Sequence, residues 1–310
     1  MFIYKGKRDK MSFFRRTAIL LAAFVFTFAA GCSKNNSSSQ TEDSSASESS
    51  VTEDSSAQDE SSEREPVQTE PGEKLKAAAK FFENDKYEFV CKVSGIGADA
   101  VLSIVKTPGM YSQITDYGFG KAYVYCNGAE TYRYDDITKS YVYEIGKITT
   151  DPNGNTISET VNKKLPQTKT HINSDYAEKY DVEEYTYTAS SYITVLDFYF
   201  DKQKGTLSKY TVNYSVEGKD DETEVRDVTK METSNVSKVE FNSYKIKADY
   251  TDFKALTETK RDEFCRATLE KVGAKEEDLL EAGITMFDLK KISYDDFSAF
   301  IIGFTAKKKQ

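Results

Sequence analysis

The chain has a single histidine, His171, in 310 residues. One histidine excludes HExxH zinc peptidases and every metal site that is built on two histidines. A nucleophilic cysteine would need His171 beside Cys91, Cys126 or Cys265, and no family signature surrounds any of these cysteines. The Gly-x-Ser-x-Gly pattern of α/β-hydrolases is also absent. We therefore expect no catalytic residue, no metal site and no cofactor site.

Tryptophan is absent as well, whereas the chain has 21 tyrosines and 19 phenylalanines. Because tryptophan is the preferred platform on which sugar rings stack, its absence argues against a carbohydrate-binding surface. Cross-strand tyrosine pairs on a half-exposed sheet explain the tyrosines without any ligand.

Residues 1–31 have the order of a secretory signal peptide. An uncharged, apolar run from Ala18 to Ala30 is shorter than the roughly 20 residues that cross a bilayer. Small residues follow the run, as they do before a signal-peptide cleavage point. Translation from Met11 would shorten the signal and leave the mature chain unchanged. The basic residues that precede the run are Lys5, Lys7, Arg8, Lys10, Arg15 and Arg16.

The segment Ala29-Ala30-Gly31-Cys32 resembles the lipobox of bacterial lipoproteins, with Ala29 where that family usually has leucine. The resemblance implies cleavage between Gly31 and Cys32 and attachment of a diacylglycerol to the Cys32 thiol. Two acyl chains hold a protein stably in a bilayer, so we expect a lipid-anchored protein on the extracytoplasmic face of the cell membrane. The alternatives are an uncleaved membrane anchor and an ordinary signal peptide.

Residues 32–72 begin with the lipidated cysteine and continue as a segment rich in serine, aspartate and glutamate. Such a composition cannot bury enough apolar surface to offset the entropy of ordering. We expect a disordered tether with a reach of about 35 Å.

Once the basic signal is removed, the mature chain is more acidic than its formal net charge of −9 indicates. This charge argues against nucleic acid as a partner and against electrostatic binding to anionic lipid.

Residues 73–254 predict an antiparallel β domain with a leading helix. From Glu73 to Asn84, apolar residues recur at helical spacing without Gly or Pro. After Asp85 the period changes to two, and Asn127-Gly128 is a strong hairpin signal. Short turns without intervening helices favour an antiparallel meander, with a central strand at 192–200. The other predicted strands are at 87–93, 101–105, 122–126, 132–134, 141–145, 185–188 and 210–216.

Residues 255–310 return to helical spacing. Leu279, Leu280 and Ile284 follow an apolar stripe that begins at Phe264. Ser293 with Asp296 three residues later resembles a capping box. We expect a C-terminal extension of several short helices that pack on the sheet.

The predicted architecture is α+β, with a curved antiparallel sheet in the form of an open half-barrel. This order resembles the outer-membrane lipoprotein carrier (LolA/LolB-like) group over residues 73–250. The stretches that carry the resemblance are Lys86-Tyr87-Glu88-Phe89, Asn127–Asp135 and Phe198-Tyr199-Phe200-Asp201. In that group the curved sheet wraps a helix and can hold an acyl chain. The resemblance therefore implies a lipid or another apolar ligand.

Three loop sequences match binding motifs only in part. Residues 95–100 fit a dinucleotide-binding fingerprint, but Glu88 and Lys92 interrupt the preceding strand and no helix follows, so we expect a glycine-rich hairpin turn. Residues 151–155 lack the glycine and glutamate of an EF-hand loop at the required spacing, which favours an Asx-rich turn. Residues 220–222 are interpreted as a solvated hairpin tip.

The cysteines leave two alternatives open. With Cys32 acylated, Cys91 and Cys126 lie in predicted strands and could form a disulfide, which would leave Cys265 unpaired. Three buried free thiols are the other alternative.

The leading functional hypothesis is a non-enzymatic, membrane-tethered binding domain for a lipid or other apolar ligand. A structural or protein-interaction module of the cell envelope is the first alternative, and it predicts a filled concavity in the sheet. The second is a cell-wall-active hydrolase, because carboxylates are too numerous for the sequence to single out a catalytic pair.

Overall fold

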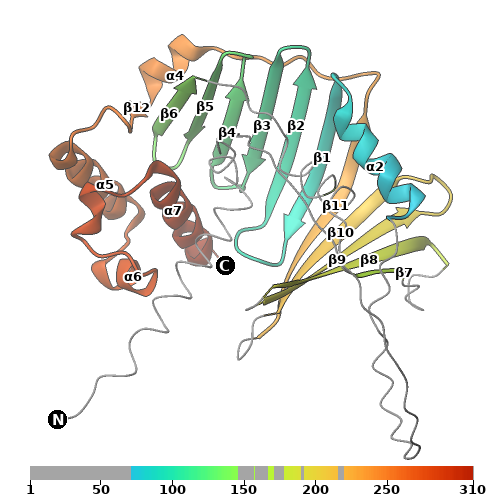
Figure 1. Ribbon diagram of the computed structural model, residues 1–310. Coiled ribbons are helices and arrows are strands. Elements are labelled where there is room, and N and C mark those ends of the chain that lie inside the picture. Colours follow the sequence, from blue (N-terminus) through green and yellow to red (C-terminus); the bar gives the residue numbers. More distant parts are fainter. Residues whose placement is uncertain are drawn as a thin grey trace, which may run out of the picture.

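The computed structural model describes residues 71–145, 157, 167–170, 178–189, 192–215 and 220–309. Within them, the strands form one open, curved sheet of twelve strands (Figure 1). One helix precedes the sheet in the chain, and several helices follow it. The predicted α+β class and the mostly antiparallel sheet are therefore confirmed. The predicted signal peptide, the cleavage point between Gly31 and Cys32, the lipid on Cys32 and the tether up to residue 70 lie outside the described residues, as do His171 and 151–155.

The sheet has the strand order β12-β6-β5-β4-β3-β2-β1-β11-β10-β9-β8-β7. Neighbouring strands are antiparallel except for β12, which runs parallel to β6. The strand bounds are β1 Tyr87–Ser94, β2 Ala100–Thr107, β3 Met110–Asp116, β4 Lys121–Cys126, β5 Glu130–Asp135, β6 Ser140–Ile145, β7 Gln167–Thr170, β8 Tyr180–Ala189, β9 Tyr192–Asp201, β10 Leu207–Ser215, β11 Glu222–Glu232 and β12 Thr251–Asp252. The helices are α2 Glu73–Glu83, α4 Ser243–Asp249, α5 Glu258–Val272, α6 Glu276–Glu281 and α7 Tyr294–Lys309, with a 3₁₀ turn at Asp288–Lys290.

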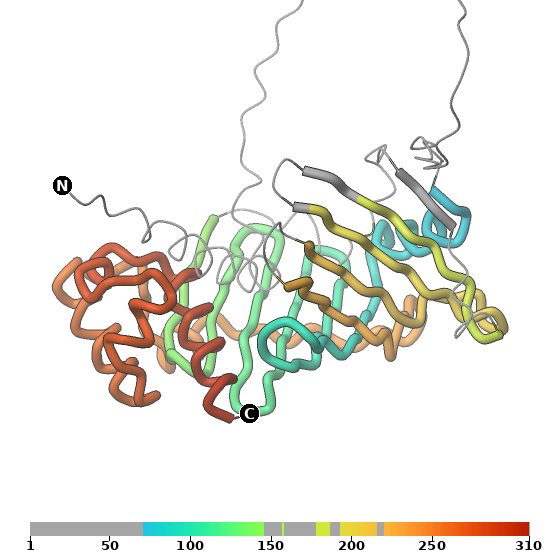
Figure 2. Tube along the Cα trace, turned by 90° about the horizontal axis from the view of Figure 1, so that it is seen from below, coloured from blue at the N-terminus to red at the C-terminus, as the bar shows by residue number. Residues whose placement is uncertain are grey.

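Strand β1 joins two meanders into one sheet. It pairs with β2 on one side and with β11 on the other, although about 130 residues of chain separate β1 from β11. One meander runs from β1 to β6, and the other runs from β7 to β11 (Figures 1 and 2). The sheet stays open because β12 and β7 are its two edges.

Helix α2 covers one face of the sheet, which we call the inner face. Alternate residues of β1, among them Phe89 and Cys91, point to this face, as the period of two requires. The buried stripe of α2, which includes Leu75 and Phe82, packs against them and against Phe198 of β9. Twenty buried residues of the described ranges belong to this core. The helix predicted from Glu73 to Asn84 is thus confirmed, and its buried stripe packs on the inner face.

The C-terminal helices form a second core beside the first meander. Cys265 of α5, Leu279 of α6 and Phe297 of α7 share this core with Val142 of β6. Helix α7 also reaches the inner face of the sheet, where Ile302 packs with Tyr117 and several buried alanines. The prediction of helices on the sheet is therefore correct for α7, whereas α5 and α6 pack mainly on the other helices.

Candidate functional site: a tyrosine-lined cleft on the outer face

Six tyrosines of β4, β5 and β6 share the outer face of the sheet, opposite to the inner face. The strand register places each tyrosine directly across from another on the neighbouring strand. Because side chains alternate along a strand, this register brings all six side chains to one surface. The cross-strand pairs are Tyr123 with Tyr134, Tyr125 with Tyr132, Tyr134 with Tyr141, and Tyr132 with Tyr143.

Three of these rings form a nearly parallel stack. The centroids of Tyr123 and Tyr134 are 4.4 Å apart, with 10° between the ring planes. Tyr125 lies 6.0 Å from Tyr134 at 13°. Such contacts contribute about 0.5–1.5 kcal/mol beyond the burial of area. The structure therefore confirms that the tyrosines form cross-strand pairs, and it shows that the pairs build a continuous aromatic surface.

The connection from β11 to α4 crosses the outer face and covers part of this surface. Its start is fixed by Glu88 of β1, which accepts hydrogen bonds from Ser237 N and Oγ at 2.9 and 2.8 Å and forms an ion pair with Lys230 at 2.7 Å. At its end, Phe241 places its ring 5.5 Å from that of Tyr125. This segment thereby holds α4 against the tyrosines.

Helix α4 is short and is held by its cap and by one buried side chain. The Asn242 side chain accepts a hydrogen bond from Lys245 N at 3.0 Å, which caps the first turn. Ile246 is the buried residue of α4 and packs with Tyr132 and Tyr141. The helix therefore lies across β5 with its lysines at the surface.

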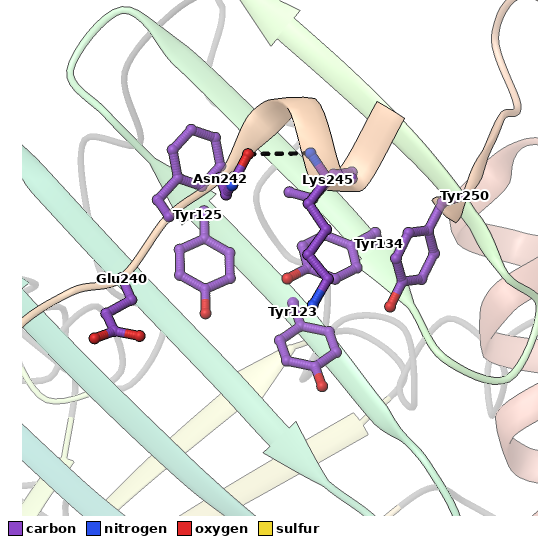
Figure 3. A pocket seen from close by; sticks show the side chains of 9 residues that line it. Tyr123, Tyr125, Tyr134, Glu240, Asn242, Lys245 and Tyr250 are labelled. Atoms are coloured by element: carbon purple, nitrogen blue, oxygen red, sulfur yellow. Dashed lines mark hydrogen bonds between the residues drawn. The ribbon is translucent and has the colours of Figure 1, made fainter. Parts of the chain in front are cut away.

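A cleft of about 350 Å³ remains between α4 and the tyrosine stack (Figure 3). Its volume is at the lower end of the roughly 300–1,000 Å³ that is typical of small-ligand sites. The lining is mostly aromatic and carries a few polar groups, which is the composition expected for such a site. The lining residues are Tyr123, Tyr125, Tyr134, Glu240, Phe241, Asn242, Lys245, Ile246 and Tyr250.

Asp136, in the turn after β5, fixes two of the lining tyrosines. Its carboxylate accepts hydrogen bonds from Tyr250 Oη at 2.6 Å and Tyr123 Oη at 3.0 Å, and it forms an ion pair with Lys139 at 2.9 Å. Burial acts to raise the pKa of Asp136, but these three donors outweigh it and lower the pKa below its usual range. The two phenol rings are thus oriented before any ligand arrives.

Four other polar groups of the cleft have no protein partner within the described ranges: the hydroxyls of Tyr125 and Tyr134, the Glu240 carboxylate and the Lys245 ammonium. Glu240 and Lys245 are exposed. Figure 3 shows the Lys245 side chain running from α4 toward Tyr123 and Tyr134, with Glu240 on the far side of Tyr125. The cleft therefore offers hydrogen-bond donors and acceptors around an aromatic surface.

The lining contains one carboxylate, Glu240, whereas glycoside hydrolysis requires two carboxyl groups that flank the scissile bond. Asp136 is not a lining residue, and its carboxylate is engaged by Tyr250, Tyr123 and Lys139. Among the described residues, no group of three or more potential ligands could hold a metal ion.

The inner face holds a buried charge pair, which we interpret as structural. Arg226 and Glu224 of β11 are both buried, and Arg226 Nε donates to Glu224 Oε1 at 2.5 Å. Arg226 Nη1 also donates to Tyr210 Oη at 3.1 Å. The two residues stand where apolar side chains would be expected on a buried strand face, and each charge is neutralised by the other.

The remaining predicted site residues do not form a site in the described part of the chain. Cys91, Cys126 and Cys265 are buried free thiols, so the disulfide alternative is wrong. Residues 95–99 connect antiparallel β1 and β2, and Ala100 begins β2. Gly95 has a φ of +102°, which confirms the glycine-rich turn, and the antiparallel pairing excludes a dinucleotide-binding βαβ unit. The described helices include none that is long and apolar enough to cross a membrane.

Comparison with protein-family models finds none that matches the chain, and comparison with curated proteins finds no significant match.

The sequence patterns did not predict the cleft, because they identified neither α4 nor the segment before it. A usable signal was present, however. Tyrosines at 123 and 125, 132 and 134, and 141 and 143 have the spacing of two that places them on one face of successive hairpins.

Proposed function

We propose that this chain is a lipid-anchored, extracytoplasmic binding protein that takes its ligand in the tyrosine-lined cleft. The lipobox at residues 29–32 and the acidic tether support the anchor and the location outside the cytoplasm. The observation that carries the binding function is the cleft itself, a preformed aromatic site with polar groups that are available to bind a ligand.

We propose the outer face rather than the inner face as the binding surface. The lipid ligand implied by the LolA/LolB-like resemblance would occupy the inner face, where α2 packs with Leu75 and Phe82. A lipid that bound beneath α2 would have to displace this helix, because Phe82 packs with its ring 5.3 Å from that of Phe89. An open sheet with a helix across its inner face still supports the resemblance as a proposal for the fold.

A role as a protein-interaction module is the second candidate. The packing of α2 on the inner face favours it, and Tyr244 on α4 adds an aromatic side chain that is 86% exposed beside the cleft. In this case the partner would be a protein of the cell envelope that binds over α4.

Photo-crosslinking in living cells tests the binding site without assuming a ligand. A photoreactive phenylalanine analogue at position 244 lies beside the cleft, and the same analogue at position 287 is a matched control because Phe287 is 73% exposed on the C-terminal helices. We expect crosslinks to envelope material at 244 that disappear in a Tyr134→Ala background. Equal crosslinking at 244 and 287, or none at 244, would contradict the proposed site.

Labelling with radioactive palmitate tests the anchor. We expect the wild-type protein to be labelled and to fractionate with membranes, and a Cys32→Ala variant to be unlabelled. Label on the Cys32→Ala variant, or no label on the wild type, would show that the lipobox assignment is wrong.

A further inference from the structure

We propose that the ligand of the cleft is a saccharide, held by stacking on the tyrosines and by hydrogen bonds to Glu240, Lys245 and the free phenol hydroxyls. This inference rests on the proposed function and names its ligand class. It also reverses the expectation, drawn from the absence of tryptophan, that the chain lacks a carbohydrate-binding surface.

Several tyrosine rings together line the cleft where a single tryptophan would otherwise serve as the stacking surface. Tyr123, Tyr125 and Tyr134 are nearly parallel, with interplanar angles of 10°, 13° and 16°. Because stacked rings cover part of one another's faces, the platform consists of the ring faces and edges that remain exposed in the cleft, to which Phe241 and Tyr250 add flanking rings. The sugar face that carries axial C–H bonds is apolar and can pack on such a platform. A single tyrosine would offer less area than an indole, but the strand register combines several.

The unengaged polar groups match the edge of a sugar ring. Glu240 has two carboxylate oxygens that can accept hydrogen bonds from a pair of adjacent hydroxyl groups, whereas the Lys245 ammonium only donates. The hydroxyls of Tyr125 and Tyr134 can do both. These four groups surround the aromatic platform within the same cleft. A ring with an apolar face and a hydroxylated edge satisfies both parts of the lining.

Purely apolar ligands fit this lining poorly. An acyl chain or a phenyl ring over the tyrosines would cover the same polar groups and leave them without water or a partner. Each buried group left unsatisfied in this way costs about 1–3 kcal/mol. Tyr123 and Tyr250 avoid this cost because Asp136 accepts from both, but Tyr125 and Tyr134 have no such acceptor in the described part of the chain.

The tether supports a ligand of this class. A lipid on Cys32 and a reach of about 35 Å would hold the cleft among the saccharide polymers that lie outside a bacterial membrane. A cleft that is open to the surface suits a polymer, because only a short part of the chain has to enter it.

Titration calorimetry on the full mature protein tests the inference. The probes are tetrasaccharides of N-acetylglucosamine, of glucose and of galacturonic acid, so that uncharged and acidic sugars are both represented. We expect saturable binding of at least one probe. Tyr134→Ala should weaken it by about tenfold, which corresponds to about 1.4 kcal/mol.

Two milder variants guard against a loss of folding. Tyr134→Phe keeps the ring and removes the hydroxyl, and Glu240→Gln changes an exposed group without a described protein partner. We expect each to weaken binding by about threefold to tenfold, which is the range for one lost hydrogen bond. Phe287→Ala, on the C-terminal helices, should leave the affinity unchanged.

The result that overturns the inference is an absence of saturable binding to all three probes, or binding that Tyr134→Phe and Glu240→Gln leave unchanged. If crosslinking at position 244 persists in that case, the cleft remains the binding site and only the saccharide class is wrong. If crosslinking is absent as well, the proposed function fails together with the inference.

Discussion

The hydroxyl of Tyr294, at the start of α7, donates a hydrogen bond to Oδ2 of Asp135, at the end of β5, over 3.0 Å. The two residues are 159 positions apart in the sequence. Ser298 of α7 donates to the same oxygen at 2.9 Å, and Arg133 of β5 forms an ion pair with Asp295 at 2.5 Å. Strand β5 therefore fixes the C-terminal helices on its inner face while its outer face carries tyrosines of the cleft.

Asp135→Ala should destabilise the protein by roughly 3 kcal/mol. Asp135 is fully buried and accepts hydrogen bonds from five donors, so its removal leaves several buried donors unsatisfied. Urea denaturation followed by circular dichroism measures the change. Asp221→Ala is the control, because Asp221 is exposed in the turn before β11 and its loss should cost less than about 0.5 kcal/mol. Equal stability of the two variants would contradict the role of Asp135.

Glu183→Gln should stabilise the protein at neutral pH. Burial raises the pKa of Glu183 above its usual range, although Tyr185 Oη donates to it at 2.5 Å. A carboxyl group whose folded pKa is raised loses its contribution to stability as the pH rises through that pKa. Wild-type stability should therefore fall as the pH rises above about 4.3, the ordinary pKa of glutamate, and the variant should lack this fall.

The difference in the free energy of unfolding between the wild type and Glu183→Gln separates the effect of Glu183 from that of other titrating groups. At a pH of about 7, the free energy of unfolding of the variant should exceed that of the wild type by an amount on the order of 1 kcal/mol. At a pH of about 4, the two proteins should be equally stable. A variant that loses stability in parallel with the wild type would show that Glu183 is not responsible.

The stacked pair of Tyr123 and Tyr134 should show a measurable coupling energy. A double-mutant cycle with Tyr123→Leu and Tyr134→Leu should give about 1 kcal/mol in unfolding experiments, because the rings are 4.4 Å apart and nearly parallel. The same cycle with Tyr123 and Tyr143, which belong to different cross-strand pairs, should give less than about 0.5 kcal/mol. Similar values for both cycles would show that the stack adds nothing specific.

The Cys265 thiol should be unreactive in the folded protein. Burial raises the pKa of Cys265 to about 12, so the thiolate that reacts with Ellman's reagent is scarce at a pH of about 8. Cys91 and Cys126 are buried in the core beneath α2. In a Cys32→Ala variant we expect no rapid reaction under native conditions and reaction of three thiols in concentrated urea. A thiol that reacts at once in the native protein would contradict this packing.

The sequence predicted those elements whose burial follows a simple period. Helix α2 and strands β1, β4 and β10 carry apolar residues at regular spacing, because one face of each is packed in the first core. The hairpin at Asn127-Gly128 was predicted by its turn chemistry, and Gly128 has a φ of +85°. Ser293 also caps the start of α7, where its Oγ accepts a hydrogen bond from Asp296 N at 3.0 Å. The return contact of the predicted capping box differs, because the Ser293 hydroxyl, and not its backbone N–H, donates to Asp296 Oδ2 at 2.7 Å.

Elements with polar buried residues were missed. Strand β3 buries Ser112, Gln113 and Thr115, and β11 buries Arg226 with Glu224, so neither shows alternating hydrophobicity. These segments form strands because they pair with neighbouring strands in the tertiary structure, and not because of a local hydrophobic pattern. Helix α4 has seven residues with a single buried side chain, which gives no helical period to detect. The cleft depends on α4, and so the candidate site could not be predicted from sequence patterns alone.

Hydrogen–deuterium exchange with and without a bound tetrasaccharide is the most direct test of where the protein binds. We expect the ligand to slow amide exchange in β4, β5 and residues 240–250, and to leave exchange in α2 and β8–β10 unchanged. Slower exchange confined to α2 and β8–β10 would place the ligand on the opposite side of the sheet and contradict the proposed site.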